Sequence, residues 1–151
     1  MLGARLAVDV GAARIGVARC DAAQLLATPM ATIAAGDDAV QHVADLAQQA
    51  GAGAVYVGLP LSLSGAVTAS TQAASEFAHR LAVAMDPIPV RLVDERLTTR
   101  SATAALRDAG HTTRSSKPVI DQAAAIVILE HALSIEQRTG ELAGSAVGQR
   151  R

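Results

Sequence analysis

Residues 5–18 constrain the fold more than any other part of this chain, because they have the pattern of a strand, a tight turn and a returning strand. The largely apolar run at 6–10 ends at Gly11, and such a run is typical of a strand inside a sheet. After the turn, Ile15 and Val17 alternate with other residues, as in the second strand of a hairpin. We therefore expect an opening β-hairpin with a central first strand.

Asp9 interrupts that apolar run, near the hairpin end of the first strand. A carboxylate inside a sheet costs several kcal/mol to desolvate unless a positive charge or a hydrogen-bond donor compensates it. One interpretation is structural: Asp9 pairs with Arg14 or caps a turn. The other is functional, and it requires further carboxylates to converge on Asp9 from elsewhere in the chain.

The rest of the chain alternates between strand and helix patterns. Further strands are expected at 27–33, 54–57 and 90–93, and helices at 37–50, 68–85, 98–109 and 119–133. A basic, Ser/Thr-rich segment at 111–118 is predicted to be a mobile loop. This order predicts an α/β fold, a mixed sheet of about five strands with helices on both faces.

Composition places the chain among soluble globular proteins. Its 151 residues suit one domain, and half of them are hydrophobic while 18% are charged. It contains neither the roughly 18-residue apolar run of a membrane span nor a signal-peptide pattern, so a cytoplasmic location without membrane contact is expected. Residues 1–136 are predicted to form the domain, and the glycine-rich residues 137–151 a disordered tail.

Acidic residues stand at the ends of three expected elements: Asp9, Asp94 or Glu95, and Asp121. The carboxyl ends of parallel strands meet at one edge of a sheet, and the periodicity of the helix at 119–133 turns Asp121 towards it. Clustered carboxylates need a counterion, and Mg²⁺ suits oxygen ligands and two-metal phosphodiester hydrolysis. Strand parity does not choose between Asp94 and Glu95 at a strand end. Taken singly, Asp121 is equally a helix-start acid and Asp94 with Glu95 a polar strand end.

Four motifs carry a resemblance to a known family. They are VDVGAARIGVA at 8–18, VGLPLSLSG at 57–65, VDERLTT at 93–99 and IDQAAAIVILE at 120–130. In this order they resemble the YqgF (RuvX) family of pre-16S rRNA nucleases or Holliday-junction-resolvase-like proteins, which have an RNase H-like fold. The resemblance implies that Asp9, Glu95 and Asp121 are the catalytic acids and hold Mg²⁺ or Mn²⁺, with Asp94 as a neighbour.

The resemblance also implies a function: a hydrolase of ribosome biogenesis that cleaves structured RNA at the 5′ end of pre-16S rRNA. A resolvase of four-way DNA junctions and a noncatalytic nucleic-acid or ribosome-assembly binding module are the alternatives. Residues 91–117 carry a local charge of +3 although the whole chain carries −1, which suits an anionic polymer. Candidate phosphate contacts are Arg14, Arg96, Arg100, Arg114 and Lys117. Tyr56 and Phe77 are the only aromatic residues, so recognition is expected to rest on backbone and shape. A homodimer is compatible with the sequence.

Overall fold

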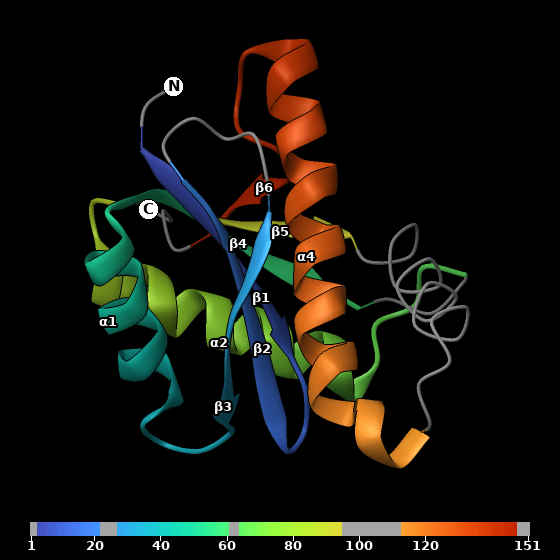
Figure 1. The fold of residues 1–151 in the computed structure, drawn as a ribbon. Helices are drawn as coiled ribbons and strands as arrows, with labels where there is room; N and C mark the ends of the chain where they lie inside the picture. Colours follow the sequence, from blue (N-terminus) through green and yellow to red (C-terminus); the bar gives the residue numbers. More distant parts are fainter. Residues whose placement is uncertain (1–2, 22–26, 61–63, 95–112, 148–151) are drawn as a thin grey trace.

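The computed structural model describes residues 3–21, 27–60, 64–94 and 113–147, with side chains in the last range given from Gln122 onward. In chain order the elements are β1 (Ala4–Val10), β2 (Arg14–Cys20), β3 (Thr28–Ala34), α1 (Ala39–Ala50), β4 (Ala52–Leu59), α2 (Ala69–Met85), β5 (Val90–Asp94), α4 (Thr113–Thr139) and β6 (Ser145–Ala146). Figure 1 shows these elements around one sheet.

The sheet is mixed, as expected, and has six strands in the order β3-β2-β1-β4-β5-β6. β1 pairs antiparallel with β2 and parallel with β4, and β4 pairs parallel with β5. The opening hairpin is therefore confirmed, with β1 in the interior of the sheet. The strand beyond the expected five is β6, which pairs antiparallel with β5.

The hairpin turn requires glycine at its first position. The Gly11 N–H donates to the Arg14 carbonyl oxygen at 2.9 Å. A Cβ atom at position 11 would lie 2.5 Å from that same oxygen, closer than any ordinary contact. The tight turn ends β1 one residue after Asp9 and sends β2 back beside it.

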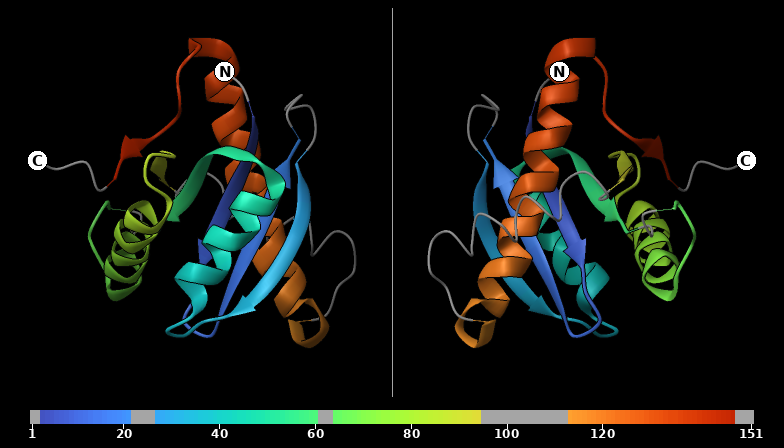
Figure 2. Two further views of the ribbon diagram at one scale, coloured as in Figure 1. Left: turned by 90° about the vertical axis from the view of Figure 1, so that its left-hand side faces the viewer. Right: turned by 90° about the vertical axis from the view of Figure 1, so that its right-hand side faces the viewer.

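Helices cover both faces of the sheet, as the alternation of strands and helices predicts. α1 and α2 lie on one face and α4 lies on the other (Figure 2). Successive residues of a strand point to opposite faces, so Leu6 and Val8 join the core beneath α1 and α2, whereas Ala7 joins the core beneath α4. Both cores are largely aliphatic. No helix in the described ranges has the length and apolar character that crossing a membrane requires.

Local sequence signals explain where α2 begins and where α1 ends. Thr68 caps α2, since its hydroxyl accepts a hydrogen bond from the Thr71 N–H at 3.3 Å and the Thr71 side chain bonds back to the Thr68 N–H. Gly51 ends α1 in the left-handed conformation, where glycine carries little penalty. These helices begin within two residues of the expected positions.

The structure corrects the prediction for α4 at both ends. The helix begins at Thr113, so residues 113–118 are helical rather than part of a mobile loop, and nothing in the hydrophobic pattern marks this extension. It continues to Thr139 because the first glycine after its apolar stripe is Gly140, whose N–H donates to the Glu136 carbonyl at 2.8 Å. The helix expected at 98–109 lies outside the described residues.

The prediction of a disordered tail was wrong for its described part. Residues 140–147, which we call the C-terminal strap, follow α4 and supply β6 to the sheet. Ala143 and Val147 are buried, with 1% and 3% of their surface exposed. The Arg91 guanidinium donates to three strap carbonyls, those of Leu142, Ala143 and Gly144, at 2.7 to 3.3 Å. The composition of this glycine-rich segment did not predict its docking, because docking depends on a few specific contacts with distant residues such as Arg91.

Removing the strap should destabilise the protein. Deletion of residues 140–151 is expected to lower the free energy of unfolding by about 3 kcal/mol, since it exposes apolar surface and removes the hydrogen bonds of Arg91. The melting temperature should fall by about 6 to 12 °C. Replacing the exposed Glu141 with Ala is the control and should leave it unchanged. An unchanged melting temperature in the deletion would show that the strap does not dock in solution.

Candidate active site

One row of residues crosses the sheet through Asp9. Asp9 pairs with Gly16 of β2, and Gly16 pairs with Thr32 of β3. On the other side of Asp9, β1 and β4 pair in parallel up to Val8 and Val57, so the next residue of β4 is Gly58, which pairs with Val93 of β5. Asp9 therefore has a glycine on each side within its row.

This row lies on the face covered by α4. Ala7 and Val93 belong to the core beneath α4. Asp9 lies two residues after Ala7 in β1, so its side chain points to the same face as that of Ala7. Asp94 follows Val93, so its side chain points to the same face as that of Leu92. Leu92 packs against the core beneath α1 and α2, on the opposite face. The register thus separates Asp9 and Asp94 onto opposite faces. It argues against Asp94 as the partner of Asp9.

The stretch of α4 around Gln122 is tied to the same row. The Gln122 side-chain amide donates to the Thr32 hydroxyl at 2.7 Å. Ala125, nearly one turn later, is completely buried against the sheet. Asp121 precedes Gln122 in this helix, and its side chain lies outside the described part of the structure. Figure 2 shows how α4 lies along this face.

A buried ionic network holds the other half of α4. The Arg5 guanidinium donates to both carboxylate oxygens of Glu136, at 3.0 and 3.3 Å, and both side chains are almost fully buried. The Tyr56 hydroxyl also donates to Glu136 and accepts from the Ala143 N–H at 3.3 Å. Burial and the bond to Glu136 raise the pKa of Tyr56. Sequence reasoning missed this network, although Arg5 at the head of an apolar strand was a signal for it.

The structure describes only some of the predicted site residues in full. Asp9 is half-buried near the end of β1. Arg14 is the first residue of β2 and lies two residues before Gly16, the partner of Asp9, so its side chain is on the same face as Asp9. The remaining predicted residues lie outside the described residues (Glu95, Arg96 and Arg100) or outside the described side chains (Arg114, Lys117 and Asp121). Within the described part, no three His, Cys, Asp or Glu residues gather to hold a metal ion.

The surroundings of Asp9 fit a divalent cation. Its neighbours in the row, Gly16 and Gly58, have no side chains to fill the space beside the carboxylate. Carboxylate oxygens are ligands that Mg²⁺ and Mn²⁺ prefer. Asp9 can therefore contribute to a cation site on the α4 face, provided that further oxygen ligands come from neighbouring elements.

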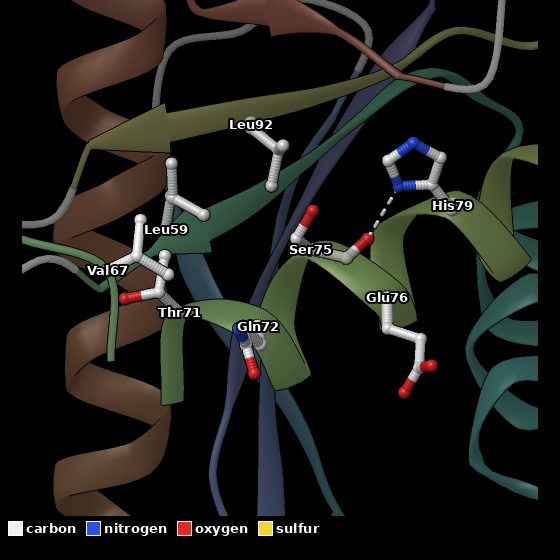
Figure 3. A pocket seen from close by; sticks show the side chains of 8 residues that line it. All are labelled: Leu59, Val67, Thr71, Gln72, Ser75, Glu76, His79 and Leu92. Atoms are coloured by element: carbon white, nitrogen blue, oxygen red, sulfur yellow. Dashed lines mark hydrogen bonds between the residues drawn. The ribbon is translucent and has the colours of Figure 1, made fainter. Parts of the chain in front are cut away.

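A pocket of about 510 Å³ lies on the opposite face, between α2 and the ends of β4 and β5. Its apolar part comes from Leu59, Val67 and Leu92 (Figure 3). His79, in α2, uses Nδ1 to bond the Ser75 carbonyl at 2.9 Å. Because Leu92 and Asp9 lie on opposite faces of the sheet, this pocket is separate from the candidate active site.

Comparison with known proteins shows the family to which the chain belongs. A model of the RuvX family, described as Holliday junction resolvase, matches residues 3–135. The chain belongs to the RuvX family. A relative from Clavibacter michiganensis subsp. michiganensis is 52% identical over 99% of this chain and 94% of its own length. Another, from Leifsonia xyli subsp. xyli, is 49% identical over 98% and 96%. Both carry the name "Putative pre-16S rRNA nuclease".

Two solved structures share the fold of this chain. RuvC of T. thermophilus, solved in complex with a Holliday junction substrate, aligns with a TM-score of 0.60 over 96% of this chain and 99% of that chain. A second Thermus thermophilus RuvC structure aligns with a TM-score of 0.57. At 16% and 15% identity these alignments establish the fold alone. The predicted RNase H-like fold is confirmed.

Proposed function

We propose that this RuvX-family protein is a metal-dependent endonuclease that processes the 5′ end of pre-16S rRNA during ribosome biogenesis in the cytoplasm. The observation that carries the proposal is the position of Asp9, between two glycines on the sheet face covered by α4. The RuvX match and the relatives named as nucleases support a hydrolase that acts on nucleic acid.

The proposed acids are Asp9, Glu95 and Asp121, which would hold Mg²⁺ or Mn²⁺. When bound, such a cation supplies activation of water and stabilisation of the leaving oxygen. Asp9 enters from near the end of β1, where pairing with β2 restrains its backbone. Asp121 would enter from α4, in which the next residue, Gln122, bonds to Thr32 of the same row.

Basic side chains would hold the nucleic-acid backbone beside these acids. Arg14 is the best placed among the residues that the structure describes, because it lies two residues from Gly16 on the Asp9 face. The other proposed phosphate contacts are Arg96, Arg100, Arg114 and Lys117. With Tyr56 buried in the Glu136 network and Phe77 buried in the core, neither aromatic ring is exposed to stack on a base. Recognition of a structured RNA by shape and backbone follows.

Cleavage of a four-way DNA junction is the second candidate, favoured by the description of the RuvX family. We rank it below rRNA processing because the relatives that match over nearly the whole chain are named for pre-16S rRNA. The RuvC structures are similar in fold but only 16% and 15% identical, so their substrate does not transfer to this chain.

One assay separates the candidates. The purified protein, with Mg²⁺ or Mn²⁺, is given a pre-16S rRNA 5′ fragment and a four-way DNA junction at equal concentration, and Asp9→Asn serves as the blank. We expect cleavage of the rRNA at a defined position near its 5′ end and little cleavage of the junction. Preferential cutting of the junction would favour a resolvase. Binding of either nucleic acid without cleavage under any divalent ion would indicate a binding module.

A further inference from the structure

We infer that the hydrogen bond between Gln122 and Thr32 is a positioning contact that holds the stretch of α4 carrying Asp121 over the row of Asp9. This inference rests on the proposed function, in which Asp9 and Asp121 share a cation. Neither Gln122 nor Thr32 is assigned to touch the cation or the substrate. Their proposed role is to hold a ligand-bearing helix at a set height and angle above the sheet.

The sheet register supplies the first step. Thr32, Gly16 and Asp9 are neighbours in one row across β3, β2 and β1. Adjacent strands are about 4.8 Å apart, so Thr32 lies about 10 Å from Asp9. Gly16, between them, carries no side chain. Between Thr32, which bonds Gln122, and Asp9, the row therefore carries no side chain.

The length of α4 supplies the second step. Glu136 anchors the far half of the helix through Arg5 and Tyr56, about 21 Å from Gln122 at 1.5 Å per residue. With that anchor alone, a tilt of about 5° would move the helix at Gln122 by about 2 Å. A misplacement of about 1 Å is enough to slow an enzyme about 100-fold. Ala124 and Ala125, the first buried residues after Gln122, are small, and the first large buried side chain of this stretch is that of Ile128.

The hydrogen bond supplies the third step. The bond is short, at 2.7 Å. It joins two partly buried side chains from residues that are 90 positions apart in the sequence. Gln122 reaches the sheet from the helix, whereas Thr32 stands in a paired strand and cannot shift freely. The pair thus fixes α4 to the sheet in the row of Asp9.

The test measures cation binding as well as cleavage in the full chain. Gln122→Ala, Thr32→Val and their double variant remove the bond, and Thr32→Ser keeps a hydroxyl at the same position. Gln41→Ala is the matched control, because it removes an exposed 2.9 Å bond to Asp45 on α1, away from the row. Mn²⁺ binding is measured by titration calorimetry with an uncleavable nucleic-acid analogue present, and cleavage is followed as Mn²⁺ is varied.

We expect Gln122→Ala and Thr32→Val each to weaken Mn²⁺ binding, and to raise the Mn²⁺ concentration for half-maximal cleavage, by about 10-fold. The double variant should be no worse than either single variant, since both remove one contact. Thr32→Ser and Gln41→Ala should match wild type. Melting temperatures without metal should change by no more than about 4 °C.

Two failures are distinguishable. If Asp9→Asn abolishes cleavage but the Gln122 and Thr32 variants bind Mn²⁺ as wild type does, only the positioning role is overturned. A lower melting temperature with unchanged Mn²⁺ dependence would likewise leave the bond with a purely structural role. If Asp9→Asn cleaves as fast as wild type, the proposed function fails and this inference fails with it.

Discussion

Asp9→Asn is expected to reduce cleavage by about 1,000-fold or more while the protein folds as wild type. A bound cation contributes several kcal/mol to transition-state stabilisation, and each 1.4 kcal/mol is a factor of ten in rate. The substitution removes the charge that holds the cation and keeps the shape of the side chain. Because Asp9 has glycines beside it in its row, the amide fits the same space. Single-turnover cleavage rates and thermal unfolding measure the two effects separately.

Asp94→Asn is the matched control for this experiment. Asp94 ends β5 on the face of α1 and α2, so its loss should leave cleavage near the wild-type rate. Glu95→Gln and Asp121→Asn should behave like Asp9→Asn if all three acids hold the cation. Full activity in Glu95→Gln together with loss in Asp94→Asn would move the third ligand to Asp94 and contradict the register argument.

Arg5→Met is expected to lower the free energy of unfolding by about 3 to 5 kcal/mol. The substitution keeps much of the volume of the side chain but leaves the Glu136 carboxylate buried without its counter-charge. Tyr56 remains as one donor, which cannot replace the two bonds from the guanidinium. The melting temperature should fall by about 6 to 20 °C. Urea unfolding at neutral pH measures the free-energy change.

Two further variants test the cause of this loss. Arg19 stands in the neighbouring strand β2 and is exposed, so Arg19→Met should leave the free energy of unfolding within about 0.5 kcal/mol of wild type. The double variant Arg5→Met, Glu136→Leu removes both charges and should recover much of the stability. If Arg5→Met alone were as stable as wild type, the ion pair would have to be solvated rather than buried.

Much of the fold could be predicted from short stretches of the chain. The alternation around Ile15 and the glycine at position 11 predicted the hairpin, and Thr68 marked the start of α2. Such signals work because a turn, a cap or a strand depends on residues a few positions apart. The acids at 9, 95 and 121 were likewise chosen from motifs, and their convergence stays a prediction.

Only the tertiary structure decided which residues share a face or a row. Strand spacing alone could not choose between Asp94 and Glu95, whereas the register places Asp94 on the face opposite Asp9. The sequence also contained no sign that the strap would dock, and Arg5 at the head of an apolar strand did not reveal that its partner is Glu136, 131 residues away. Local patterns are set by neighbours in sequence, but register and burial depend on contacts between distant segments. These contacts form only when the sheet and α4 pack together.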